Sequence, residues 1–200
     1  MFNSCSSLVV APKLPAMILK ESCYSNMFAS CVALKTAPKL PATTLAESCY
    51  ENMFEGCPSL VIAPELPAMT LTYGCYNGMF RDCESLVEVP ELPATTLASY
   101  CYSSMFRGCI ELSEAPELPS TKLVSNCYSS MFSSCQSLAV APILPAKVLQ
   151  NSCYENMFTG CTNLSYIEML ATDVSAENCL SGWVDNVSNS GMFIKAESMT

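Results

Sequence analysis

The residues in this sequence most able to do chemistry are its 14 cysteines, two in each unit of an internal repeat. A thiol can act as a nucleophile, bind a metal, form a disulfide or pack as a small apolar side chain. A cysteine nucleophile needs a neighbouring base, usually histidine, and the sequence contains no histidine. Zinc sites usually use closely spaced ligand pairs, and no Cys-x-x-Cys pair occurs. The cysteines therefore do not predict a catalytic site or a zinc site.

Disulfides and the packing of free thiols are harder to separate. Cys23 and Cys31 lie eight residues apart, which is about 12 Å along a helix, whereas a disulfide needs Cα atoms about 4.4–6.8 Å apart. Pairing along one cysteine column is easier, but each column has seven members and would leave one thiol over. Cysteine is also among the most buried residue types. We favour a ladder of packed free thiols over disulfides and metal binding, which stay open as alternatives.

Carboxylates form the second candidate group, at positions 10 and 13 counted from the Met that opens each unit. If both positions face solvent on one side, five glutamates cluster over units three to five: Glu65, Glu88, Glu91, Glu114 and Glu117. Like charges about 5 Å apart repel by about 0.8 kcal/mol even in water. A catalytic carboxylate pair needs a desolvated acid, which a row of exposed carboxylates lacks. We predict a solvated acidic face, with a site for a basic partner or a weak Ca²⁺ site as functional alternatives.

The elements that must position these groups come from an internal repeat without insertion or deletion. Its units begin at residues 1, 27, 53, 79, 105, 131 and 157. We number positions within a unit as columns 1 to 26. Cysteine fills columns 5 and 23, leucine fills columns 8 and 14, and proline fills columns 12 and 15 of the first six units. A fixed period of this length indicates stacked coils that each contact only their neighbours.

One unit predicts the elements of a coil. Leu34–Ala37 is typical of a short strand that ends at Pro38, because proline has no N–H for a ladder. Thr43–Leu45 is typical of a second strand. From Cys23 to Cys31 the apolar residues recur at helical spacing, which favours a short helix, or a turn, that crosses to the next unit. Both cysteine columns then face inward, and each tyrosine of column 24 packs on the next coil with its hydroxyl at the surface. An exposed tyrosine ladder is the alternative.

The chain divides into an array over residues 1–182 and a tail over residues 183–200. Unit seven loses both prolines, and Trp183 and Val184 then replace Met-Phe. We interpret the tail as a degenerate C-terminal cap. The first unit starts in repeat phase without a polar cap, although stacked repeats need caps. We therefore expect the protein to extend upstream, with any export signal there, and to continue past the tail.

Composition excludes several kinds of partner. The net charge is −9 and no basic run occurs, which disfavours nucleic acid and anionic membranes. No apolar run is long enough to span a bilayer, and no glycine-rich phosphate loop is present. We predict a chain that is not an enzyme, binds no cofactor and no metal, and does not insert into a membrane in this segment.

The pattern LxxAPxLPAxxLxxxCYxxMFxxCxxL resembles the BspA-like, or Treponema-type, leucine-rich repeat of bacterial surface proteins. Met27, Phe28, Cys31 and Leu34 match that family's Ala-Phe-x-x-Cys-x-x-Leu. Cys23 falls where the family usually has isoleucine, which favours packing. The unit here is longer than that family's usual unit, and its Cys-Tyr-x-x-Met-Phe variant resembles arrays of gut Bacteroidales and their phages.

The resemblance implies an α/β repeat solenoid, a leucine-rich-repeat-like right-handed stack of seven coils. It also implies a non-enzymatic adhesion module at the cell surface or secreted, with a host or bacterial surface protein or glycoprotein as partner. The exposed columns 3, 4, 10, 13, 17 and 20 to 22 vary over a constant core, which favours binding. A structural stalk or a phage tail-associated receptor-binding component is the alternative.

Overall fold

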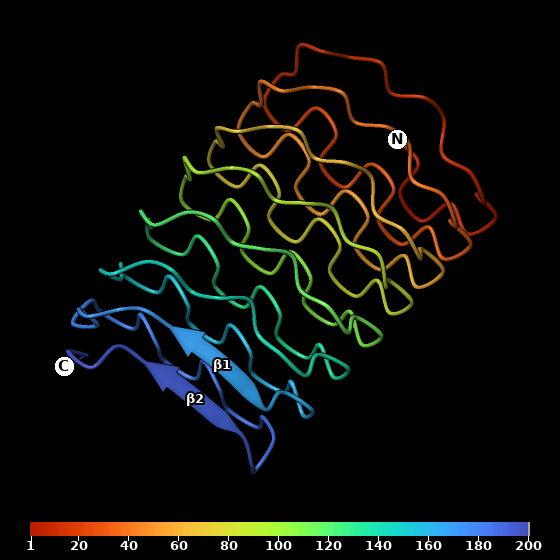
Figure 1. Ribbon diagram of the computed structural model, residues 1–200. Coiled ribbons are helices and arrows are strands. Elements are labelled where there is room, and N and C mark those ends of the chain that lie inside the picture. Colours follow the sequence, from red (N-terminus) through yellow and green to blue (C-terminus); the bar gives the residue numbers. More distant parts are fainter. Residues whose placement is uncertain (200) are drawn as a thin grey trace.

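The computed structural model describes residues 1–199 and shows a stack of coils (Figure 1). The chain runs from the first coil at one end of the stack to the last coil at the other. Parallel single-residue bridges join Val10 to Thr36 and Thr36 to Ile62. Because each of these bridges joins the same column of two neighbouring units, the repeat of the sequence is also the repeat of the structure.

Each coil has two arms. Columns 8 to 19 form an extended arm, and columns 20 to 26 together with columns 1 to 7 of the next unit form a turn arm. One pair of strands longer than a bridge occurs within residues 1–199: β1 (Tyr166–Met169) and β2 (Met192–Lys195). The two strands are parallel, with Tyr166 opposite Met192. Elsewhere the extended arms touch through isolated bridges. The prediction of two short strands in every coil is therefore wrong, although the bridges lie inside the predicted segments.

The prolines explain why the strands stay short. A proline gives no N–H to a ladder and restricts the residue before it. Units one to six carry proline at columns 12 and 15, whereas unit seven has Glu168 and Ala171 there, and β1 runs through Glu168. Gly191 precedes β2, where a side chain would collide with the carbonyl oxygen of Ser165.

The turn arm is a run of overlapping turns in which alternate N–H groups have different partners. The Met27 N–H donates to the carbonyl of Tyr24 in the same coil, at 3.1 Å. The next N–H, of Phe28, donates to the carbonyl of Met53 in the next coil, at 2.9 Å. In an α-helix every N–H would donate four residues back within its own segment. Residues 1–199 contain no helix, so the helix predicted here is wrong and the turn predicted as its alternative is confirmed. The α part of the expected α/β class is missing from these residues.

Left-handed residues make this path possible. Columns 4, 22 and 26 have positive φ in all seven units. These columns hold glycine, serine, asparagine or aspartate, apart from Tyr100. Glycine and asparagine adopt this conformation most readily, and six of the seven glycines lie in these columns. The third residue of a type II turn requires it. A four-residue spacing of buried side chains therefore arises here from paired turns rather than from a helix.

The core lies between the two arms. The extended arm contributes buried leucines, and the turn arm contributes buried Met, Phe, Cys and Tyr. The Phe54 and Phe80 rings stack at 5.7 Å, and the Tyr76 and Tyr102 rings at 5.9 Å, as successive rings do along both ladders. Of the 14 cysteines 12 are buried; Cys5 and Cys23 of the first coil are not. The prediction that both cysteine columns face inward is therefore confirmed in the inner coils.

Candidate interaction surface

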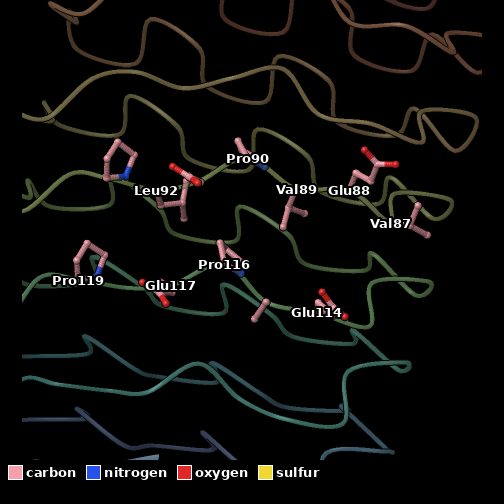
Figure 2. A pocket seen from close by; sticks show the side chains of 12 residues that line it. Val87, Glu88, Val89, Pro90, Leu92, Glu114, Pro116, Glu117 and Pro119 are labelled. Atoms are coloured by element: carbon pink, nitrogen blue, oxygen red, sulfur yellow. The ribbon is translucent and has the colours of Figure 1, made fainter.

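The five predicted glutamates lie together on the outer side of the extended arm. All five side chains are exposed, and together they line two adjoining grooves between coils three and five. Figure 2 shows Glu114 below Glu88 in neighbouring coils, and Glu117 farther along its coil. Their role as a binding site stays a prediction.

The larger groove, between coils four and five, has a volume of about 780 Å³ and carries Glu88, Glu91, Glu114 and Glu117. The smaller groove, between coils three and four, has a volume of about 510 Å³ and adds Glu65. Prolines of columns 12 and 15 line both grooves, as Figure 2 shows for Pro90 and Pro116. The groove walls therefore combine stiff proline rings with carboxylates.

No positive charge balances these carboxylates inside the grooves. Neither groove is lined by lysine or arginine. Within residues 1–199 one ion pair occurs, between Arg81 and Glu55 on the turn arm. Exposed carboxylates without partners attract cations and basic segments over a Debye length of about 8–10 Å at moderate salt. The described residues hold no group of three metal-ligating side chains, so the geometry gives no support to a weak Ca²⁺ site.

The thiols have structural partners. The Cys57 thiol donates to the carbonyl oxygen of Phe28 in the preceding coil at 3.1 Å, and Cys83 donates to Phe54 in the same way. Burial raises the pKa of the Cys57 thiol to about 12 and that of Cys49 to about 11. The thiolate is the reactive form of cysteine, so these buried groups are inert at neutral pH. All 14 cysteines are free thiols in the structure.

The tyrosine ladder differs from the sequence prediction in one respect. The rings of the inner coils pack as predicted, but the hydroxyls of Tyr50 and Tyr128 are buried and have no hydrogen-bond partner. Burial raises the pKa of both tyrosines above the ordinary value. The prediction of surface hydroxyls is wrong for these two residues, because the neighbouring coils enclose the whole ring.

The sequence analysis missed an apolar component of the same face. Among residues 1–199, 18 large hydrophobic side chains are exposed, and 14 of them lie in columns 9 to 18 of the extended arm. These residues are Val9, Val10, Met17, Ile18, Val61, Ile62, Met69, Val87, Val140, Ile143, Val148, Met192, Phe193 and Ile194. The signal was available, because columns 9, 10, 17 and 18 repeatedly hold Val, Ile or Met beside a proline corner. We call the outer side of the extended arm the extended face. Phe193 is the exception, because it pairs with the buried Ile167, contacts Trp183 and is exposed at the end of the stack.

Comparison with known proteins adds no relative. The chain matches no protein-family model, and neither a curated protein nor a solved structure matches it. Residues 1–199 also contain no helix that is long and apolar enough to cross a membrane. The structural findings are thus a repeat of stacked coils, built mostly from turns, with one acidic and partly apolar face.

Proposed function

We propose that this chain is a non-enzymatic interaction module of a bacterial protein that is secreted or displayed at the cell surface. Its repeat belongs, in this proposal, to the BspA-like leucine-rich repeats and forms a right-handed solenoid. The partner is a surface protein or glycoprotein of a host or of another bacterium. The motif resemblance supports the family, and the extended face supports the binding role.

The observation that carries the proposal is the concentration of exposed apolar side chains on one face. Exposed apolar patches often mark sites for a partner, and 14 of 18 exposed large hydrophobic residues lie on the extended arm, mostly in coils one, three and six and in β2. The turn arm, by contrast, mostly exposes polar and charged residues. The five unpaired glutamates beside the grooves add charge selectivity, which guides association and discriminates between partners.

The proposal is tested by surface binding of the purified chain to immobilised mucin and extracellular-matrix proteins. A Glu65→Lys/Glu91→Lys/Glu117→Lys variant removes three carboxylates of the extended face. The control variant, Glu21→Lys/Glu47→Lys/Glu177→Lys, makes the same charge change on exposed residues of column 21. We expect saturable binding that the first variant loses and the control retains.

Two results would contradict this assignment. Equal loss in both variants would show that total charge, rather than the extended face, governs binding. No binding to any protein on the panel would favour the stalk, for which the uninterrupted Phe and Tyr ladders supply a stiff rod. A stalk needs no partner on its sides and would retain its length in both variants.

A further inference from the structure

Column 13 carries an ordered set of charges along the extended face. From the first coil onward it reads Lys13, Lys39, Glu65, Glu91 and Glu117, and all five side chains are exposed. The sign changes once, between coils two and three. The face is therefore positive at one end of this stretch and negative at the other, at spacings set by the stacking of coils.

We propose that coils one to four of the extended face pair with the same coils of a second copy of this chain, in antiparallel orientation. A two-fold axis that lies in the face between coils two and three reverses the order of coils and keeps each column opposite itself. It places Lys39 opposite Glu65 of the other copy and Lys13 opposite Glu91. Because an isologous contact repeats each interaction, the pairing contains four ion pairs.

The charge order selects this arrangement over the simplest alternative. A two-fold axis along the stack would place every coil opposite its own counterpart. Lysine would then face lysine and glutamate would face glutamate, and like charges in an interface are strongly unfavourable. Of these two two-fold arrangements, only the antiparallel pairing puts opposite signs together over four consecutive coils. The inference stands on the order of charges and does not require the proposed foreign partner.

The same four coils supply apolar surface that a second copy would cover. Eight of the 14 exposed hydrophobic residues of the extended arm lie there, including Val10, Ile18 and Ile62, which are 62%, 90% and 52% exposed. Four coils at about 4.8 Å and ten residues at about 3.3 Å span about 19 by 33 Å, or about 630 Å² per copy. The total of about 1,250 Å² reaches the lower limit of stable protein interfaces, about 1,200 Å².

The pairing leaves part of the acidic surface free. Coil five lies outside the four paired coils, so Glu114 and Glu117 stay accessible to another partner. A variant at Lys39 thus changes self-pairing without touching any of the five glutamates of the proposed binding site. Failure of self-pairing and failure of partner binding are therefore separate results.

The test is sedimentation velocity of the purified chain over a concentration series, at about 50 mM and 500 mM salt. We expect a monomer–dimer equilibrium whose Kd rises with salt, because salt screens exposed ion pairs. Lys39→Glu and Glu65→Lys should each raise the Kd by at least about tenfold, since each turns two attractions into two repulsions. Lys20→Glu, on an exposed lysine of column 20, is the matched control and should leave the Kd unchanged.

Mixing makes the test specific to this geometry. In a mixed dimer the glutamate introduced at position 39 of one variant faces the lysine introduced at position 65 of the other. The unchanged Lys39 and Glu65 face each other as well, so an equimolar mixture should regain a heterodimer of wild-type affinity. The double variant Lys39→Glu/Glu65→Lys should regain the homodimer. A chain that stays monomeric at all concentrations overturns the proposal. So do single variants that dimerise like the wild type, or a mixture that fails to recover.

Discussion

Coils one to six and the last stretch of the chain share the 26-residue repeat, but the hydrogen bonds that join neighbouring coils differ between the two regions. The proline coils touch through single bridges on the extended arm, and their turn arms donate alternate N–H groups to the next coil. Beyond the last proline, β1 and β2 form a continuous four-residue pair. The phenylalanine ladder ends in the tail at Trp183, which tilts by 57° against Phe158 and contacts Phe193 edge-on.

The difference shows what proline contributes to this repeat. Where proline is missing, the corner also shortens: Leu144 pairs with Met169 and Val148 with Asp173, each one position short of the full period. The prolines thus hold the spacing of the corner and prevent long open strands, which would be edges for aggregation. The repeating coils depend instead on the turn arm and its buried Cys, Phe and Tyr columns. The stability of the repeating coils and that of the β1–β2 end should therefore respond differently to substitution and to pH.

The largest effect expected is the response to alkaline pH, which acts on the thiols of the repeating coils. Burial raises the pKa of Cys49 to about 11 and those of Cys57 and Cys75 to about 12, from an ordinary value of 9.0. The unfolded chain releases these protons near pH 9, whereas the folded chain keeps them. Their stabilising contribution is therefore complete below pH 9 and is lost as pH rises toward 11–12.

Each such thiol should cost about 1 kcal/mol between pH 9 and pH 10. Ten thiols of the inner coils are strongly buried, so the loss is on the order of 10 kcal/mol, enough to unfold a typical domain. Urea midpoints measured from pH 7 to pH 10 check this expectation. Cys109→Ala should reduce the fall in the free energy of unfolding between pH 9 and pH 10, because one buried thiol is removed. A midpoint that stays constant up to pH 10 would show that the cysteine columns are open to solvent.

The second effect compares two phenylalanines. Phe80 is fully buried in its ladder, whereas Phe193 of β2 is 47% exposed. Phe80→Ala should cost about 3–5 kcal/mol, because it leaves a cavity between two stacked rings. Phe193→Ala should cost about 1 kcal/mol or less. Urea unfolding measures both. Equal losses would mean that the tail stabilises the stack as strongly as the inner coils do.

The sequence predicted what depends on repetition and burial. The period, the inward cysteines and the exposure of Glu65, Glu91 and Glu117 all follow from a fixed phase combined with residue polarity. Repetition and burial could not decide between a helix and turns, because both structures bury side chains at spacings of about four residues. The deciding signal lay in the outward columns 4, 22 and 26, where Ser, Asn and Gly adopt positive φ. Hydroxyl burial at Tyr50 depends on how closely neighbouring coils approach, which composition does not report.

The third effect tests the proline argument directly. Glu168→Pro/Ala171→Pro gives coil seven the prolines of the other coils. The Glu168 N–H faces coil six, because Met192 donates to Ser165 in the parallel ladder. The two prolines therefore act through their fixed φ, which a strand residue does not adopt. We expect β1 to shrink to a bridge near Tyr166 and β2 to lose its pairing, at a cost of about 1–3 kcal/mol for its hydrogen bonds. Amide exchange at Ile194 should accelerate. Glu168→Ala/Ala171→Ser leaves the backbone free to adopt strand dihedrals and should leave that exchange unchanged. Slow exchange in both variants would assign the short strands to something other than proline.

The smallest effect concerns the unpartnered tyrosine hydroxyls of the repeating coils. The Tyr50 hydroxyl is buried without a partner, which costs about 1–3 kcal/mol of desolvation, while its ring stacks on Tyr76 at 5.9 Å. Tyr50→Phe keeps the ring and removes that cost, so the urea midpoint should rise by the equivalent of about 1 kcal/mol. Tyr73→Phe, at a ring that is 51% exposed, is the control and should change little. A lower midpoint for Tyr50→Phe would mean that this hydroxyl has a partner in solution, such as an enclosed water, and that the repeating coils are less dry than their stacked rings indicate.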